Sequence, residues 1–257
     1  MRITVLGGKG DSTNAVINAI SEKYDIAAAI VEDDVPLRVF LWKRIRKLGI
    51  ATVIGQIGFS VIVPRILRKK SYKRIEQIKR HYELKTDDGY KNKVNCKFVN
   101  SINDKSAMKE IIKSDPDIII VNGTRIISKS IIERINVPII NMHMGITPKY
   151  RGVHGGYWAV VNNDEENCGV TIHIVDEGID TGKVIRQKRI RIQANDNYVT
   201  YPYLQMGEGI RAEKEILEKF EETGRIDTHM VKFPSRLWTH PTLLQYISNK
   251  RKNRRFK

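Results

Sequence analysis

Three polar residues on separate stretches of the chain have side chains suited to group-transfer chemistry. Asn141 and His143 lie at the end of an apolar run, and Asp180 lies in a segment punctuated by Gly178 and Gly182. An amide can donate a hydrogen bond to a developing oxyanion, an imidazole can carry a proton near neutral pH, and a carboxylate can orient that imidazole. A histidine after a strand is more often structural, so these residue types alone do not define a reaction.

Alternating apolar runs predict the elements that must position these residues. Runs buried on both faces that alternate with helices are typical of an α/β protein with a Rossmann-like, open, mostly parallel sheet and helices on both faces. Binding sites in such sheets lie outside the carboxyl ends of the strands, where Asn141 and His143 are expected. The predicted strands cover residues 3–6, 26–31, 96–99, 117–121, 137–141, 169–175 and 184–192, and the predicted helices 15–20, 106–113, 128–134 and 203–220.

Length and composition limit the class of protein. The 257 residues are 41% hydrophobic and 29% charged, which is typical of a globular chain and excludes a disordered chain, a collagen or a coiled coil. The two cysteines, Cys96 and Cys168, are too few for a disulfide framework or a zinc cluster, and no metal site is expected. The first residues enter a strand-like run without the layout of a signal peptide, so a cytoplasmic location is expected.

The net charge of +16 is concentrated in two segments. Between Val35 and Tyr82 there are 13 Lys and Arg and one acid, Glu76, and residues 250–257 add six basic residues and no acid. The rest of the chain is therefore close to neutral. The charge belongs to one insertion, at about residues 35–85, and one tail, and nucleic acid is not expected as the substrate.

The insertion combines basic and apolar segments. A basic helix is expected over residues 37–47, followed by 17 uncharged residues from Leu48 to Pro64 and by a second basic segment, 65–80. The uncharged segment is shorter than the roughly 20 apolar residues that span a bilayer. A helical hairpin packed against the body is the favoured interpretation. An element on an anionic membrane surface, which would make the protein membrane-peripheral, and a phosphate or nucleic-acid patch stay open.

Four ordered motifs give the sequence a resemblance to a known family. They are Asn141-x-His143, the Pro-Lys-Tyr-Arg-Gly run of 148–152, the Gly-Val-Thr-Ile-His run of 169–173, and the Asp-Thr-Gly run of 180–182. In this order and spacing they resemble the folate-dependent formyltransferases, which include glycinamide ribonucleotide transformylase, methionyl-tRNA formyltransferase and the amino-sugar N-formyltransferases. The resemblance covers roughly residues 3–31 and 117–192. It implies the formyltransferase fold, with a catalytic domain over 1–221 and a C-terminal extension with a basic tail over 222–257.

The resemblance also implies an activity. A formyl group would move from the co-substrate 10-formyltetrahydrofolate to a primary amine of a small substrate, with no metal required. Asn141 would donate a hydrogen bond to the oxyanion, His143 would donate or relay protons, and Asp180 would support the imidazole. An amino sugar or sugar nucleotide is the first choice of acceptor and phosphoribosylglycinamide the second. Methionyl-tRNA is third, because the tRNA enzyme usually carries a further C-terminal barrel.

A formyltransferase-like binding protein at a membrane, with an unused site, is the alternative from a different class. The complete set of Asn141, His143 and Asp180 favours the enzyme over this alternative. The sequence makes no prediction of the oligomeric state.

Two loops are candidates for binding the formyl donor. The segment after the fourth core strand resembles the family's folate loop, and the segment before Asp180 resembles the loop that closes the other side. Core packing is an equally open role for Ile126 and Ile127. The expected donor-binding residues are Thr124, Arg125, Ile126, Ile127, Val175, Asp176 and Gly178.

The acceptor side is predicted less sharply. The glycine-rich turn after the first strand resembles a phosphate-binding loop, but Asp11 inside it would repel phosphate unless it faces away or caps the helix. A plain tight turn stays open there, as packing roles do for His154 and Tyr157, while His173 is expected to point into the structure. The expected acceptor-binding residues are Gly10, Ser12, Asn14, Arg151, His154 and Tyr157.

Overall fold

A seven-stranded sheet organises the chain, which a computed structural model describes over residues 1–253. The strand order is β3-β2-β1-β4-β5-β7-β8. The five strands from β3 to β5 in this order are parallel, β7 is antiparallel to β5, and β8 is antiparallel to β7. The predicted α/β class with a mostly parallel sheet is therefore confirmed. The strands are β1 (Arg2–Gly8), β2 (Asp25–Glu32), β3 (Cys96–Val99), β4 (Ile118–Asn122), β5 (Ile139–His143), β7 (Gly169–Ile174) and β8 (Val184–Arg189).

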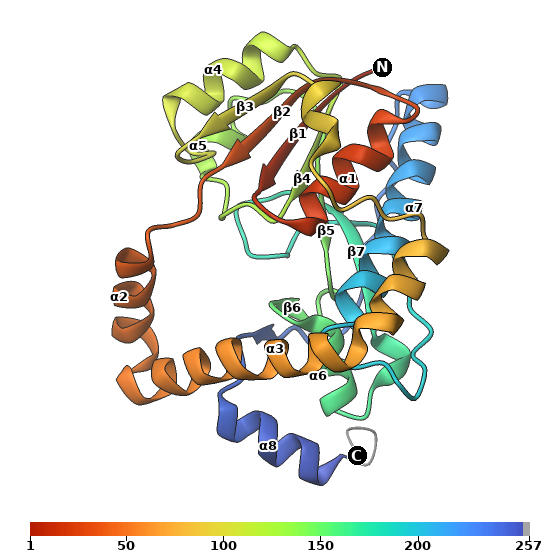
Figure 1. The fold of residues 1–257 in the computed structure, drawn as a ribbon. Coiled ribbons are helices and arrows are strands. Elements are labelled where there is room, and N and C mark those ends of the chain that lie inside the picture. Colours follow the sequence, from red (N-terminus) through yellow and green to blue (C-terminus); the bar gives the residue numbers. More distant parts are fainter. Residues whose placement is uncertain (254–257) are drawn as a thin grey trace.

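Helices cover both faces of the sheet because the central strands are apolar on both sides (Figure 1). Ile3 and Val5 of β1 belong to a core shared with the helices on one face, and Leu6 belongs to a core on the other face. Alternating side chains of one buried strand thus serve two hydrophobic cores. The first face is covered by α1 (Asp11–Ser21) and α7 (Tyr201–Thr223), and the second by α4 (Lys105–Ser114) and α5 (Lys129–Ile132).

The insertion forms two helices that turn sharply at Gly49. These helices are α2 (Leu37–Leu48) and α3 (Ile50–His81), which continues through the uncharged segment and Pro64. A helical hairpin packed against the body was expected. Helix α3 is packed in this way, whereas no residue of α2 is buried. Among the described residues, α3 is the one helix that is long and apolar enough to cross a membrane by length and composition. The sequence analysis had expected only the 17 uncharged residues from Leu48 to Pro64, which are too few for a span.

The chain after α7 packs against β6 and the insertion. A two-residue strand, β9 (Leu237–Trp238), pairs with β6 (Arg151–Gly152), and α8 (Leu243–Lys252) packs against α3. Two short elements connect the sheet strands nearby, α6 (Gly155–Val161) and the 3-10 turn Glu165–Asn167, and a further 3-10 turn, Gly89–Asn92, precedes β3. The division at residue 221 stays a prediction, and the end of the expected basic tail, residues 254–257, lies outside the described residues.

Burial of Phe59 generates a stability prediction for α3. The Phe59 ring is fully buried and packs edge-on against Tyr198 at 4.9 Å between ring centroids. Phe59→Ala is expected to lower the free energy of unfolding by about 3–5 kcal/mol, because the cavity cannot close fully. The matched change Ile57→Ala, on the exposed side of α3, is expected to stay within about 0.5 kcal/mol. Equal effects of the two changes in denaturant titrations would show that α3 is not docked.

Candidate active site

Strand β5 brings Asn141 and His143 to the carboxyl edge of the sheet. The two residues are two positions apart on one strand, so their side chains leave the same face of the sheet. The next strand in the sheet, β7, pairs antiparallel with β5 and places His173 opposite Asn141. An amide and two imidazoles therefore come together where ligands bind in open sheets of this kind.

Asp180 completes this cluster from the loop between β7 and β8. Its Oδ1 lies 3.3 Å from His143 Nδ1 and 3.7 Å from His173 Nε2, and its Oδ2 accepts a hydrogen bond of 2.8 Å from the Gly152 backbone N–H. The backbone of Asp180 is left-handed, with φ of 52°. Aspartate tolerates this region better than most residues, and such a conformation persists where surrounding contacts hold it.

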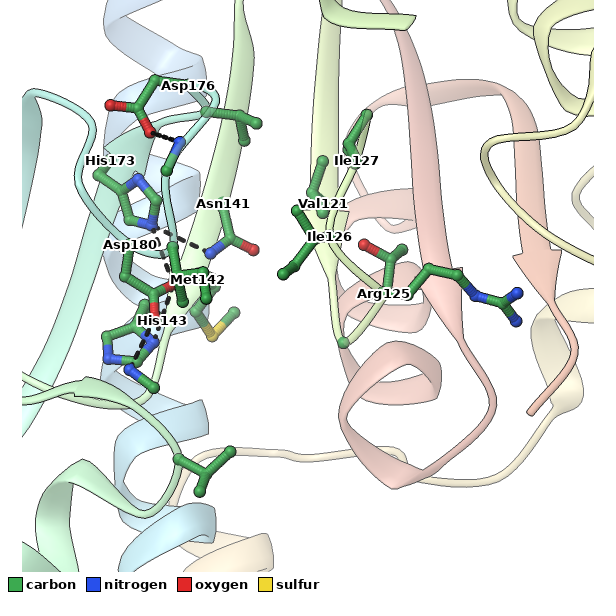
Figure 2. A pocket seen from close by; sticks show the side chains of 17 residues that line it. Val121, Arg125, Ile126, Ile127, Asn141, Met142, His143, His173, Asp176 and Asp180 are labelled. Carbon is green, nitrogen blue, oxygen red and sulfur yellow. Dashed lines mark hydrogen bonds and ion pairs between the residues drawn. The ribbon is translucent and has the colours of Figure 1, made fainter. Parts of the chain in front are cut away.

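His173 is the main correction to the expected site. It is buried, as expected, but it lies in the same cluster as Asn141 and Asp180 and lines the same cavity. His173 Nδ1 donates to the Ile174 carbonyl at 2.8 Å, so in the neutral ring Nε2 accepts the Asn141 amide N–H at 3.1 Å. Figure 2 shows this arrangement, with the Asn141 amide nitrogen toward His173 and its oxygen toward the open side of the pocket. His173 therefore fixes the orientation of the Asn141 amide.

His143 is held between two hydrogen-bond acceptors. Its Nε2 lies 2.7 Å from the Tyr150 carbonyl oxygen, and its Nδ1 faces Asp180. A neutral imidazole has one proton and can donate to only one of them, whereas the imidazolium donates to both. Burial nevertheless lowers the pKa of His143, and the negative charge of Asp180 opposes that shift.

The carboxylate of Asp180 is held in its charged form. Burial alone would raise the pKa of Asp180, but the interactions with His173 and His143 outweigh it, and the pKa is lowered. The N–H of Gly152 acts in the same direction. The interaction with His173 requires a proton on Nε2, which only the imidazolium has when Nδ1 donates to Ile174. The site therefore combines a carboxylate that stays ionised with a buried imidazole that is readily deprotonated.

The cluster lines one side of a cavity of about 360 Å³. Figure 2 shows Asn141, His143, His173 and Asp180 on this side and the apolar side chains Val121, Ile126 and Ile127 on the other. All seven residues expected to bind the donor line this cavity: Thr124, Arg125, Ile126, Ile127, Val175, Asp176 and Gly178. Core packing and cavity lining were both open roles for the isoleucines, and each occurs: Ile127 is buried in the core and Ile126 is exposed at the cavity.

Glu32 holds the loop that forms the apolar wall, a role the sequence analysis missed. Its buried carboxylate accepts the Arg125 backbone N–H at 2.5 Å and lies 2.9 Å from the Arg125 guanidinium Nε. It also accepts the Ile102 N–H at 2.9 Å. The signal available in the sequence was the run of three acids, Glu32 to Asp34, at the carboxyl end of a buried apolar strand, the position where polar residues tend to serve a site.

The glycine-rich turn lies outside this cavity. Gly10 and Asn14 line a separate cavity of about 420 Å³ that also includes two carboxylates, Asp87 and Asp88. The side-chain donors are engaged within the protein: Ser12 Oγ donates to Asn122 at 2.9 Å, and Asn14 Nδ2 to the Thr86 carbonyl at 2.9 Å. Asp11 faces away, since its carboxylate accepts the Tyr203 hydroxyl at 2.9 Å.

Arg151, His154 and Tyr157, which were also expected on the acceptor side, do not line the cavity. His154 is half-buried beside His240, with 2.9 Å between their ring nitrogens, and the buried Tyr157 packs edge-on against Trp158. Arg151 lies on β6 directly before Gly152, and its buried Nε has no hydrogen-bond partner within the described residues. Arg151 is the nearest of the three along the chain, because the next residue, Gly152, lines the cavity.

The carboxyl edge of this α/β sheet thus gathers an amide, two imidazoles and a carboxylate around one cavity. The family model described as formyl transferase matches residues 68–203, more than half of the chain, and the chain belongs to this family. The match includes all four motifs and begins inside the insertion. It does not include residues 3–31, which the resemblance had also covered.

Curated relatives agree with this family. A methionyl-tRNA formyltransferase of Thermodesulfovibrio yellowstonii is 39% identical over 98 residues, which cover 38% of this chain and 32% of the relative. One from Clostridioides difficile is 34% identical over 120 residues, covering 46% of this chain and 38% of the relative. The matched region thus spans less than two fifths of the length of either relative.

Solved structures share the fold across most of the chain. A phosphoribosylglycinamide formyltransferase from Coxiella burnetii is similar with a TM-score of 0.57 and 20% identity, covering 90% of each chain. A sugar N-formyltransferase from a Shewanella species has a TM-score of 0.55 and 13% identity, covering 92% of this chain and 76% of that one. At these identities the likeness concerns the fold.

The geometry around His143 predicts its titration. Because burial lowers its pKa, His143 is expected to titrate below its ordinary value of about 6.5. Asp180→Asn removes the negative charge that favours the imidazolium and is expected to lower this pKa further. The measurement is the pH dependence of the imidazole NMR signals, with Asp176→Asn, another carboxylate lining the cavity, as the control. An unchanged or higher pKa in Asp180→Asn would contradict the assigned contact.

Proposed function

We propose that this protein is a cytoplasmic N-formyltransferase that uses 10-formyltetrahydrofolate and acts on a primary amine of a small substrate. The observation that carries the proposal is the convergence of Asn141, His143 and Asp180 around one cavity. Membership of the formyl transferase family supports the reaction class. The catalytic roles of the three residues are part of the proposal.

The cavity fits the folate part of the donor in size and chemistry. Ligand pockets typically have a volume of about 300–1,000 Å³ and apolar walls with a few placed polar groups, and this cavity of about 360 Å³ lies in that range. Val121 and Ile126 offer an apolar surface for a flat ring, and the backbone of the loop from Gly123 to Arg125 offers polar groups at its edge. When bound there, the donor supplies the formyl carbon that the amine attacks.

The residues of the cluster divide the work of the transfer. A bond forms between the amine nitrogen and the formyl carbon, the bond from that carbon to the folate nitrogen breaks, and one proton moves from the amine to the departing nitrogen. The Asn141 amide has a second N–H beyond the one bound by His173, and this N–H can stabilise the oxyanion. His173 holds that amide in place and acts as a positioning residue.

His143 is suited to carry the proton. At neutral pH its lowered pKa leaves the imidazole mostly unprotonated, so it can accept a proton directly or through a water. The imidazolium then donates to both the Tyr150 carbonyl and Asp180, which satisfies both acceptors that the neutral ring cannot satisfy together. The ionised carboxylate of Asp180 stabilises that charge, and the same contacts allow the proton to leave again for the product.

An amino sugar or sugar nucleotide is the acceptor we propose first, with phosphoribosylglycinamide as the alternative. The structural neighbours include enzymes named for sugar and for phosphoribosylglycinamide substrates, and the curated relatives are methionyl-tRNA enzymes. The test is consumption of 10-formyltetrahydrofolate by the purified protein with a panel that contains all three acceptors. No turnover with any acceptor would favour the alternative proposal of a formyltransferase-like binding protein.

Removing the proton carrier or its carboxylate tests the mechanism. His143→Ala and Asp180→Asn are each expected to lower kcat at least about a hundredfold, the lower range for lost acid–base catalysis. His229→Ala, an exposed histidine outside the cavity, is the matched control and should leave kcat unchanged. Steady-state kinetics with the accepted amine give the answer. A variant with a near-normal rate would remove that residue from the mechanism.

The loop anchor gives a separate prediction for donor binding. Glu32→Gln weakens the hold on the Arg125 backbone and guanidinium, so the KM for the formyl donor should rise about tenfold, equivalent to about 1.4 kcal/mol. The kcat should change little, because Glu32 contacts none of the catalytic side chains. Asp34→Asn, an exposed acid two residues later, is the control, and thermal unfolding of both variants separates binding from stability. An unchanged KM in a folded Glu32→Gln variant would contradict this role.

A further inference from the structure

Helix α2 exposes apolar side chains all around its axis. None of its 12 residues is buried, and Trp42 is 57% and Leu37 69% exposed. Figure 1 shows α2 standing apart from the sheet, and Arg44 of α2 donates a hydrogen bond to Gln56 of α3. A helix that buries no apolar face gains little from folding alone, since helical stability in proteins comes mainly from packing such a face. Its apolar residues therefore call for a partner.

Helix α3 adds an apolar stripe on the side turned away from the protein. Ile50, Ile54, Ile57 and Val61 recur at intervals of three and four residues, which places them on one face, and Ile54 is 62% exposed. Arg65, Arg68 and Tyr72 continue the same stripe toward the C-terminal end of the helix. The opposite face contains the buried Val53, Phe59 and Val63. We call α2 together with this stripe the insertion surface.

The charged residues within the insertion surface are all basic. From Val35 to Ile75 the chain contains 11 Lys and Arg and no acid. Several of these cations lie beside exposed apolar groups; the Arg46 guanidinium stands over the Trp42 ring at 4.6 Å. The C-terminal end of α8, residues 250–252, adds three further cations. A second copy of the chain on this surface would bring like charges together, whereas anionic headgroups would neutralise them.

We propose that the insertion surface docks this protein onto an anionic membrane. The apolar side chains of α2 and of the α3 stripe enter the boundary between headgroups and acyl chains, and the flanking Lys and Arg contact the anionic headgroups. The inference concerns an interaction surface and stands whether or not the proposed formyl transfer is correct.

The contacts of α3 favour docking on the surface over a membrane span. Gln56 is buried, accepts a hydrogen bond from Arg44 at 2.5 Å and donates one to the His240 carbonyl at 2.7 Å. Farther along, the Arg74 guanidinium donates to Asp196 at 2.8 and 3.0 Å. Moving α3 into a bilayer would break these polar contacts and expose the cavity left by Phe59. A helix lying in the interface keeps them.

Flotation with vesicles of two compositions tests the proposal on the full chain. Binding is expected to phosphatidylcholine vesicles that contain phosphatidylglycerol, and little or none to pure phosphatidylcholine. Raising the salt from about 0.05 to about 0.5 M should weaken binding, because the cationic contacts are screened. Addition of the vesicles should also shift the emission of exposed Trp42 to shorter wavelength, and Trp42→Phe should remove this shift while binding persists.

Two variants separate the apolar and the cationic contributions. The triple change Ile54→Ser, Ile57→Ser and Val61→Ser, and the triple change Lys69→Gln, Lys70→Gln and Lys73→Gln, are each expected to weaken vesicle binding at least about tenfold. All six side chains are exposed, so both variants should fold. The matched controls lie elsewhere: Phe98→Ser, Ile112→Ser and Met230→Ser for the apolar set, and Lys105→Gln, Lys109→Gln and Lys113→Gln for the cations.

Several outcomes would overturn the proposal. These are absence of binding to anionic vesicles, equal loss in test and control variants, or retention in the membrane after alkaline carbonate extraction, which would indicate a span. A dimer in light scattering that the Ile54, Ile57 and Val61 changes dissolve would assign the surface to a second copy. Formyl transfer is assayed in the same samples without vesicles, so loss of membrane binding with retained turnover, or the reverse, distinguishes this inference from the proposed function.

Discussion

The buried carboxylate of Asp180 is the constraint around which the site is arranged. A charge removed from water must be paired and hydrogen-bonded, or the group becomes neutral. Here His143 and His173 face one oxygen and the Gly152 N–H binds the other, so that three separate chain segments meet at this group. The left-handed backbone at Asp180 is maintained by the same contacts. The polar side chains of the site therefore lie together because they stabilise the buried charge of Asp180.

Much of the fold could be predicted from the sequence because the core strands are strongly apolar. The runs that became β1, β4 and β5 are bounded by polar residues, and their burial on both faces requires helices on both sides. Asn141 and His143 then follow from the rule that sites lie at the carboxyl ends of such strands. Asp180 was predicted from the family motif. Their meeting in space agrees with that expectation, while their roles stay predictions.

The misplaced residues depend on information that a single sequence does not contain. His173 alternates with two isoleucines, so its pattern is that of a core strand residue, and only the antiparallel register of β7 on β5 brings it to Asn141. His154 followed a family-like motif, yet it contacts His240, which comes 86 residues later, and does not line the cavity. The sequence analysis did not predict one continuous helix through Pro64, where packing of Phe59 and Val63 on the body outweighs the low helix propensity of proline.

The site and the insertion are mechanically separate although they are neighbours in sequence. Glu32, at the end of β2, directs its hydrogen bonds to Ile102 and to Arg125, and the Asp33 carbonyl accepts from the same guanidinium at 2.5 Å. The wall of the cavity is thus tied to the sheet before the chain enters α2. The contacts of α3 go to α7, α8 and the Asp196 segment. Because none of these contacts involves the loop at Arg125, the sheet can keep the cavity unchanged while the insertion contacts another surface.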